Sequence, residues 1–191
     1  MKIRFAVPED APALLAIYGQ YIDTSVTFEY ELPSAAEFAE RIRSTLTCYP
    51  YLVWEEEGTI RGYAYAHRAW ERAAYSWNAE LSVYLDRAST GKGAGRRLYR
   101  ALMELLRLQG IRAVYGVVTQ PNPASSALHR SMGFEKAALV HQAGFKNGAW
   151  HDVAWFEKEI APHGGAPEPI RPVNQLPREQ VEAILRKEEC S

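Results

Sequence analysis

Three glycines within five residues, Gly91-Lys92-Gly93-Ala94-Gly95, could bind a ligand by backbone geometry alone. They follow a β-type stretch and precede a helical one. Backbone N–H groups and the positive end of a helix dipole would therefore face an anion there. Glycine allows close approach because no side chain separates the backbone from the ligand. Lys92 and Arg96 add positive charge, so the spacing predicts a turn that binds phosphate.

Two common phosphate-binding motifs do not fit this run. A P-loop would need glycine at position 86, which is Asp86, and Ser or Thr after Lys92. A dinucleotide fingerprint would need glycine at position 96, which is Arg96, and would follow an early strand. An ordinary surface turn before a helix stays open as the alternative.

The composition limits the partners of this chain of 191 residues, which is the size of one ordinary domain. With 22 basic and 23 acidic residues, the net charge is −1, so no nucleic-acid or membrane partner is expected. Cys48 and Cys190 lack metal-type spacing, and we expect free thiols and no metal site. Pro8, Glu9 and Asp10 come too early for a signal sequence, so a cytoplasmic location is expected.

Apolar periodicity divides the chain into strands and helices. Ser34 and Glu37 form a capping box at one predicted helix start, and Gly110 is placed to end another helix. The connection of the last two strands is expected at 144–148. Mixed strands and helices without strict alternation favour an α/β or α+β fold. The predicted strands are 2–7, 51–54, 59–67, 79–85, 114–119, 134–141 and 150–160, and the predicted helices begin at 8–10 and after 34 and span 96–108 and 124–132.

The C-terminal part differs in composition from the rest. Residues 161–177 contain five prolines and no apolar period, which predicts an extended segment. Residues 178–188 could form a short helix. We therefore predict one domain over 1–161 and a proline-rich tail with a possible short helix over 162–191.

Two motifs together resemble those of the GNAT-family N-acetyltransferases. The run from Arg87 to Arg96 is similar to the family's pyrophosphate loop, although Ala88 stands where Gln or Arg is usual. Asn122 followed by 127–134 resembles the second cofactor motif. Further stretches resemble the phosphinothricin/methionine sulfoximine N-acetyltransferase subgroup over about 2–175, namely 21–25, 75–80, 82–84, 128–129, 143–153 and 171–173.

The resemblance implies a fold and a reaction. The fold would be the GNAT fold, a mixed, mostly antiparallel and centrally splayed sheet with helices on both faces. The reaction would be direct acetyl transfer from acetyl-CoA to a small amino-acid-like amine in a ternary complex. No metal would take part, and the subgroup suggests a homodimer. The resemblance leaves open the physiological amine and the role of 176–191.

The resemblance also implies catalytic roles. Glu80 would remove a proton from the substrate ammonium, because only a free amine can attack a thioester. His129 stands where many relatives carry Tyr, and would protonate the departing thiolate or assist Glu80. Solvent stays open as the proton donor. The structural alternatives are an exposed carboxylate at a strand end and a histidine packed against the sheet.

Binding residues follow from the same resemblance. The expected acetyl-CoA ligands are Val83, Tyr84, Leu85, Gly91, Lys92, Gly93, Ala94, Gly95, Arg96, Asn122 and Ser125. Phe28, Arg72 and Tyr75 would bind the amino acid, and Arg72 suits a carboxylate or phosphinate. The subgroup often carries one more basic residue near Trp70-Glu71-Arg72, which leaves methionine sulfoximine or sulfone open beside phosphinothricin.

Two other functions stay open at this point. One is a GNAT enzyme that acts on another amine, such as a protein N-terminus, a lysine or an aminoglycoside. The other is a non-catalytic acyl-CoA-binding module that keeps the loop without the chemistry.

Overall fold

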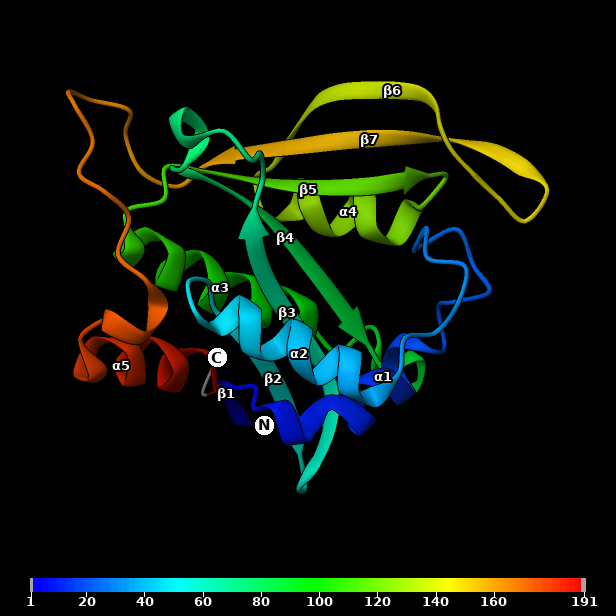
Figure 1. Cartoon of the computed structure of the whole chain (residues 1–191), viewed down its shortest axis with the longest axis horizontal. Helices are drawn as coiled ribbons and strands as arrows, with labels where there is room; N and C mark the ends of the chain where they lie inside the picture. Colours follow the sequence, from blue (N-terminus) through cyan, green and yellow to red (C-terminus); the bar gives the residue numbers. More distant parts are fainter. Residues whose placement is uncertain (1, 190–191) are drawn as a thin grey trace.

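The computed structural model describes residues 2–189, which form one seven-stranded sheet in the order β1-β2-β3-β4-β5-β7-β6 (Figure 1). Its strands are β1 (Lys2–Phe5), β2 (Tyr51–Glu56), β3 (Thr59–Arg68), β4 (Asn78–Leu85), β5 (Ala113–Gln120), β6 (Glu135–Lys146) and β7 (Ala149–Glu159). The α-helices are α1 (Ala11–Tyr18), α2 (Ala35–Leu46), α3 (Ala94–Gln109), α4 (Pro123–Ser131) and α5 (Arg178–Glu189). Short 3₁₀ turns span Pro8–Asp10, Ala73–Tyr75, Arg87–Ser89 and Val173–Gln175. Between residues 2 and 189, no helix has the length and apolar character to cross a membrane.

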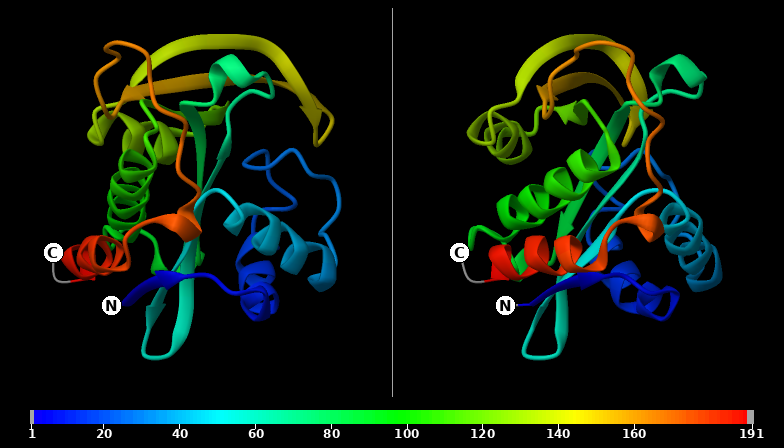
Figure 2. Two further views of the ribbon diagram at one scale, coloured as in Figure 1. Left: turned by 60° about the vertical axis from the view of Figure 1, so that its left-hand side comes forward. Right: turned by 90° about the vertical axis from the view of Figure 1, so that its left-hand side faces the viewer.

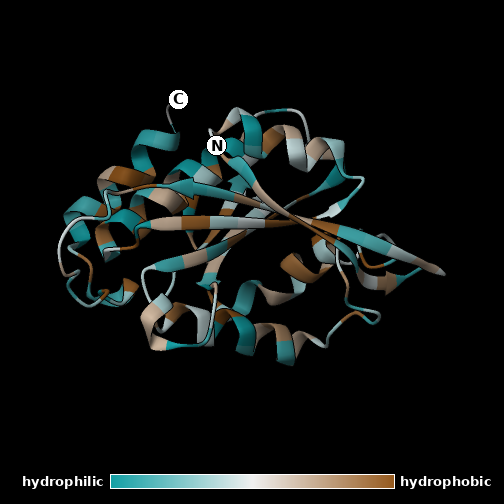
Figure 3. Ribbon diagram, turned by 90° about the horizontal axis from the view of Figure 1, so that it is seen from above, coloured by the Kyte–Doolittle hydropathy of each residue, from teal (hydrophilic) through white to brown (hydrophobic). Residues whose placement is uncertain are grey.

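Helices cover both faces of the sheet, as the sequence predicts (Figure 2). Hydrophobic residues occur on the strands and on the helices around them (Figure 3), and successive residues of a strand point to opposite faces of the sheet. Leu52 and Trp54 of β2 join the core under α3, whereas Tyr51 and Val53 join the core under α1 and α2. The two layers hold the strands rigidly between them.

Local sequence signals fix several helix ends. The Ser34 hydroxyl accepts from the Glu37 N–H, and the Glu37 carboxylate accepts from the Ser34 N–H, which confirms the predicted capping box. Gly110 adopts φ 98° at the end of α3, the left-handed conformation that glycine favours.

The β6–β7 connection is shorter than the sequence predicts. Gly144, Phe145 and Lys146 belong to β6, and the turn consists of Asn147 and Gly148. Both turn residues have positive φ, 51° and 75°, which suits a two-residue hairpin turn. The predicted five-residue connection at 144–148 was therefore wrong, because Asn-Gly makes the tight turn by itself.

The centre of the sheet is splayed. Every pair of neighbouring strands is antiparallel except β4 and β5, which are parallel. Their pairing covers three positions, from Asn78↔Ala113 to Glu80↔Tyr115. Beyond Glu80 the two strands separate, so the backbone of β4 that faces β5 has no strand partner.

The C-terminal segment packs against the domain. It bonds to the end of α3 and to the loop before β2, because the Arg171 N–H donates to the Gln109 carbonyl at 2.8 Å and the Val173 N–H to the Cys48 carbonyl at 2.9 Å. Residues 178–189 form α5, whose buried Glu188 pairs with Arg100 of α3 at 2.8 Å. Cys48 is a partly buried free thiol, and Cys190 lies outside the described residues.

A buried lysine holds the 22–30 loop against the β6–β7 hairpin. Lys146 is 2% exposed, and its ammonium donates to the carbonyl oxygens of Ile22, Thr27 and Glu29 at 2.5–2.8 Å. The Tyr30 hydroxyl donates to the Phe145 carbonyl of the same hairpin. One buried cation therefore joins three carbonyl groups of the loop to the hairpin.

Replacing Lys146 with methionine should release this loop. The substitution keeps most of the volume but removes a charged donor from three carbonyl oxygens. We expect the free energy of unfolding to fall by about 2–4 kcal/mol, with faster amide exchange confined to 22–30. Denaturant titration and hydrogen exchange measure both effects. Lys136→Met, at an exposed position of β6, is the control, and equal losses in both variants would contradict the anchoring role.

Candidate active site

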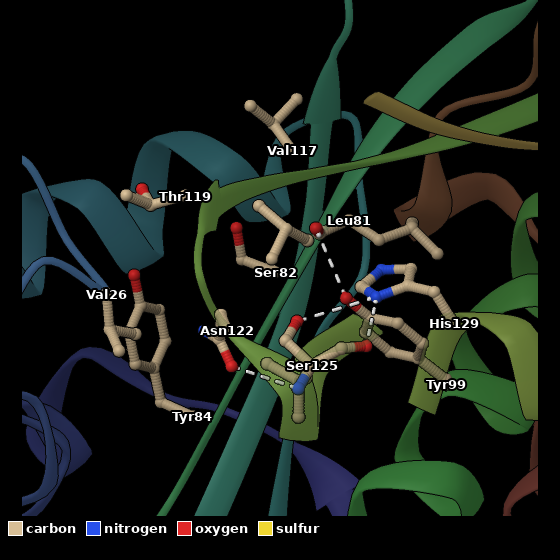
Figure 4. Close-up of a pocket in the computed structure, with 12 residues that line it drawn as sticks. Val26, Leu81, Ser82, Tyr84, Tyr99, Val117, Thr119, Asn122, Ser125 and His129 are labelled. Atoms are coloured by element: carbon tan, nitrogen blue, oxygen red, sulfur yellow. Dashed lines mark hydrogen bonds between the residues drawn. The ribbon is translucent and has the colours of Figure 1, made fainter. Parts of the chain in front are cut away.

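The separation of β4 and β5 opens a cleft in the middle of the sheet. Figure 4 shows side chains from β4, β5, α3 and α4 directed toward this space. The lining residues are Val26, Leu81, Ser82, Val83, Tyr84, Tyr99, Val117, Val118, Thr119, Asn122, Ser125 and His129. Five of the predicted site residues are among them, namely Val83, Tyr84, Asn122, Ser125 and His129, and the predicted Leu85 follows Tyr84 at the end of β4.

The glycine loop connects the end of β4 to the start of α3. Gly91 and Gly93 have φ values of 78° and 81°, in the left-handed region that favours glycine. Among the described residues, no side-chain hydrogen bond caps α3 at Gly93, so the helix start lacks a capping side chain. Gly95 packs at 3.5 Å from Leu85 and 3.7 Å from Leu128, measured from an ideal Cβ position. This geometry suits an anion at the helix start.

The basic side chains of the loop have protein partners. Lys92 lies 3.8 Å from the carboxylate of Glu56, and Arg96 donates to the Ser131 hydroxyl at 3.1 Å. The Arg87 guanidinium lies over the ring of Tyr21, 5.3 Å from its centroid. The backbone of the loop is therefore better suited than its side chains to bind an anion, and the side chains add positive potential around it.

The second motif forms the opposite wall of the cleft. Asn122 is the N-cap of α4, and its side-chain oxygen accepts from the Ser125 N–H at 3.0 Å. The helix therefore begins at the cleft, with Ser125 facing into it (Figure 4). Both residues lie where the sequence predicts cofactor contacts.

Glu80 is the last residue of β4 that pairs with β5, so it sits where the two strands separate. Its side chain is 22% exposed, and Oε1 lies 3.7 Å from Nε2 of His67 on β3. Burial raises the pKa of Glu80 above its ordinary value, and the neighbouring His67 opposes this rise. A carboxylate with a raised pKa is suited to accept a proton from an amine.

His129 lies inside the protein rather than at an open surface. It is 2% exposed, and its ring packs between Tyr99, Phe134 and Phe156 with centroid distances of 5.1–5.6 Å. Its Nδ1–H donates to the Ser125 carbonyl at 2.8 Å. Burial lowers the pKa of His129, which favours the neutral ring.

The other ring nitrogen of His129 faces the backbone of β5. A Cβ atom at Gly116 would lie 2.0 Å from Nε2, so only glycine fits there. Nε2 has no hydrogen-bond partner among residues 2–189. A neutral ring whose one N–H is already donated holds no proton to give to a thiolate. The geometry therefore favours solvent as the donor.

An aromatic group covers the sheet beside Glu80. Trp70 lies 4.8 Å from Tyr115, 5.9 Å from Trp155 and 5.2 Å from Tyr75 between ring centroids. Tyr115 is the register partner of Glu80, so this group lies on the face of the sheet that carries Glu80. Arg72 is exposed at the start of the 3₁₀ turn in the same loop.

Phe28 lies apart from that loop, against the β6–β7 hairpin. A Cβ atom at Gly144 would lie 2.4 Å from the Phe28 ring, so the glycine makes room for it. His151 is 6.2 Å away between ring centroids. The structure thus places Phe28 beside the hairpin and places Arg72 and Tyr75 beside Trp70.

Several cleft residues escaped the sequence analysis. Tyr99 belongs to the apolar face of α3, and its hydroxyl donates to the Leu81 carbonyl at 3.3 Å. Ser82 shares the Glu80 face of β4 by strand alternation, which is the signal that could have identified it. Val117 and Thr119 alternate in the same way on β5.

The chain matches the Acetyltransferase (GNAT) domain family over residues 3–155, and therefore belongs to the GNAT acetyltransferases. It is 35% identical over 180 residues to a phosphinothricin N-acetyltransferase of Streptomyces viridochromogenes, which covers 92% of this chain and 96% of the relative. It is 33% identical over 173 residues to an L-methionine sulfoximine/L-methionine sulfone acetyltransferase of Pseudomonas aeruginosa, covering 87% and 98% of the two chains.

A solved structure shares the fold. The phosphinothricin acetyltransferase of Sinorhizobium meliloti, crystallised in complex with acetyl-CoA, has a TM-score of 0.84 and 35% identity, and the match covers 91% of this chain and 96% of that one. The predicted GNAT fold, with its mostly antiparallel sheet, is confirmed.

Replacing His129 with leucine should separate packing from proton transfer. Leucine keeps an apolar side chain in the aromatic surroundings but removes the N–H that bonds to Ser125. We expect the free energy of unfolding to fall by about 1 kcal/mol, while kcat keeps the wild-type pH dependence. Thermal unfolding and a pH series of initial rates measure the two effects. A pH profile that loses one limb would show instead that the imidazole exchanges protons.

Proposed function

We propose that this acetyltransferase transfers the acetyl group of acetyl-CoA to the amino group of a small amino-acid-like substrate of the methionine sulfoximine, methionine sulfone or phosphinothricin type. The observation that carries this proposal is the position of Glu80. A mostly buried carboxylate lies where β4 and β5 separate, and an anion-binding helix start lies beyond the other end of β4. The similar enzymes named above act on these amino acids.

The residues present fit acetyl-CoA as the acetyl donor. The backbone of Gly91, Gly93 and Gly95 would hold the pyrophosphate at the start of α3. The backbone of β4 from Val83 to Leu85, which has no strand partner on the β5 side, would bind the pantetheine amides. Asn122 and Ser125 would complete the opposite wall. Among residues 2–189 no cluster of three or more metal-ligating side chains occurs, and the proposed chemistry uses none.

The proposed transfer occurs directly in a ternary complex. Glu80 would take a proton from the substrate ammonium, and the resulting amine would attack the thioester carbonyl. An N–H of β4 would stabilise the oxyanion, as backbone donors do in other acyl transfers. The thiolate would leave with a proton from solvent, because burial favours the neutral ring of His129 and its Nδ1–H is donated to the Ser125 carbonyl. Cys48 packs against the core under α3, so among residues 2–189 no cysteine lines the cleft to form an acyl-enzyme.

Arg72, Tyr75 and Phe28 are the proposed ligands of the acceptor. The loop of Arg72 and Tyr75 lies on the Glu80 face of the sheet, and a guanidinium there would bind the amino-acid carboxylate. With Glu71 between Trp70 and Arg72, the loop provides one cation and one anion. This balance of charges favours methionine sulfone or sulfoximine, which have one anionic group each, over phosphinothricin, which has two.

We further propose a cytoplasmic homodimer with one catalytic domain. Exposed apolar side chains of the β6–β7 hairpin, Leu139, Val140, Phe145 and Trp150, are 36–61% exposed and would be covered in a dimer. The free thiol of Cys48 fits a reducing compartment. Residues 1–161 would form the catalytic domain, with 162–191 as a C-terminal extension.

An acceptor panel tests the proposed function. With acetyl-CoA fixed, we expect release of free thiol with methionine sulfone and methionine sulfoximine, and slower release with phosphinothricin. A peptide N-terminus, a lysine peptide and an aminoglycoside provide the competing amines. Faster release with one of these would reassign the acceptor. Binding of acetyl-CoA without release in the presence of any amine would identify a non-catalytic acyl-CoA-binding module.

Replacing Glu80 with glutamine should remove the base without changing its shape. Because burial raises the pKa of Glu80, wild-type kcat/KM should fall as pH decreases through that pKa. The variant should lose about 10²–10⁴-fold in kcat at neutral pH, and less at a pH above the pKa of the amine. Initial rates of both enzymes from about pH 5 to about pH 10 measure this pH dependence. Glu179→Gln, at an exposed position of α5, is the control, and full activity of Glu80→Gln at all pH values would exclude this role.

A further inference from the structure

His67 is the side chain that meets Glu80 across the β3–β4 ladder. The two residues are register partners in the antiparallel pair, so their side chains lie on the same face of the sheet. Nε2 of His67 lies 3.7 Å from Oε1 of Glu80. This distance requires a small movement or one bridging water for proton exchange.

The other ring nitrogen fixes the orientation of His67. Nδ1 lies 3.0 Å from the Arg68 carbonyl oxygen, which can only accept a hydrogen bond. Nδ1 therefore carries hydrogen in both charge states of the ring. In the neutral state the lone pair of Nε2 faces Glu80, and in the charged state an N–H faces it. His67 can thus accept a proton from Glu80 or stabilise its carboxylate.

A cavity is lined in part by His67. Its volume is about 200 Å³, and it lies between α2 and strands β2 and β3. His67 is 44% exposed at its side chain, twice the 22% of Glu80. The cavity is large enough to contain water and has polar side chains in its wall. His67 therefore connects a buried carboxylate with a space that solvent can reach. The lining residues are Tyr18, Glu29, Phe38, Arg41, Ser44, Thr45, Tyr51, Tyr63, Tyr65 and His67.

The other charged groups around this pair are already paired or neutral. Arg41 of α2 is bound to Glu29 of the preceding loop at 2.6 Å, which offsets its charge. Tyr65 of β3, Tyr99 of α3 and Tyr115 of β5 have pKa values raised by burial, so all three are neutral near pH 7. His67 is thus the titratable group in direct contact with Glu80 that can carry a positive charge.

We propose that His67 is a positioning residue for the reaction, which holds Glu80 in its orientation and passes the substrate proton from Glu80 to the solvent of this cavity. This inference rests on the proposed function of Glu80. One proton leaves the substrate ammonium for an oxygen of Glu80 and then moves to Nε2 of His67, which leaves the carboxylate ionised. The imidazolium releases the proton to water. No bond to carbon and no electron transfer is involved.

Substitution of His67 tests the relay. Without the imidazolium, the carboxyl of Glu80 should hold its proton to higher pH. In His67→Gln we expect the acidic limb of kcat/KM to move upward by about 0.5–1 pH unit and kcat to fall about 3–10-fold at neutral pH. The KM for acetyl-CoA should not change. In His67→Ala, added imidazole should restore part of kcat, which a purely structural loss would not allow.

Two further measurements make the outcome unambiguous. His163→Gln removes an exposed histidine that also contacts a carboxylate, Glu159 at 2.9 Å, and should keep the wild-type pH profile. Carbon-13 NMR titration of the Glu80 carboxyl in wild-type and His67→Gln protein needs no substrate, and should show a higher pKa in the variant. Unchanged titration, an unmoved acidic limb and no imidazole rescue would overturn the relay.

The two proposals fail in different ways. If the wild-type enzyme acetylates no amine, the proposed function is wrong, and the NMR titration still decides whether His67 controls the charge of Glu80. If Glu80→Gln is inactive while His67→Gln matches the wild type at every pH, Glu80 stands as the base and the relay is excluded. Thermal unfolding of both His67 variants identifies any loss that comes from the fold.

Discussion

The structure depends on how early the parallel pairing of β4 and β5 ends. Three residue pairs join the strands, and the last is Glu80↔Tyr115. Backbone groups that lose a strand partner need another partner. The Tyr99 hydroxyl supplies one to the Leu81 carbonyl at 3.3 Å, and the Tyr21 hydroxyl supplies one to the Leu85 carbonyl at 2.5 Å. The other groups on this edge are those that the pantetheine amides would meet in the proposed complex. The separation of β4 and β5 also places Glu80, the proposed base, next to the cleft.

The absence of side chains allows the walls of the site to approach each other. Gly116 admits the ring of His129 against β5, and Gly144 admits the ring of Phe28 against β6. At both positions a Cβ atom would lie 2.0–2.4 Å from the aromatic ring, a distance that no rotamer change of a packed ring can relieve. These glycines differ from Gly91 and Gly93, where the space is open and the positive φ requires glycine. Glycine is therefore needed at two of these positions to make room for a ring and at the other two to allow a positive φ.

Features that reside in a short stretch of chain could be predicted from the sequence. The glycine loop and the capping box of Ser34 and Glu37 each occur within a few residues, and the structure contains both of them. Contacts between distant strands could not be predicted in this way. Lys146 reads as part of a hairpin connection, yet its ammonium lies among carbonyl oxygens from residues 22–29. The environments of Glu80 and His129 depend on register and packing, which periodicity does not specify.

The position of Glu80 involves two opposing demands. Burial raises its pKa, which makes the carboxylate a stronger base but also leaves more of it protonated and inactive at a given pH. A nearby positive charge lowers the pKa again and increases the ionised fraction. A permanent cation such as arginine would hold the carboxylate ionised at the cost of its basicity. An imidazole can carry either charge state: as the imidazolium His67 would stabilise the ionised Glu80, and once that ring has released its Nε2 proton to water, the neutral ring could accept a proton from Glu80.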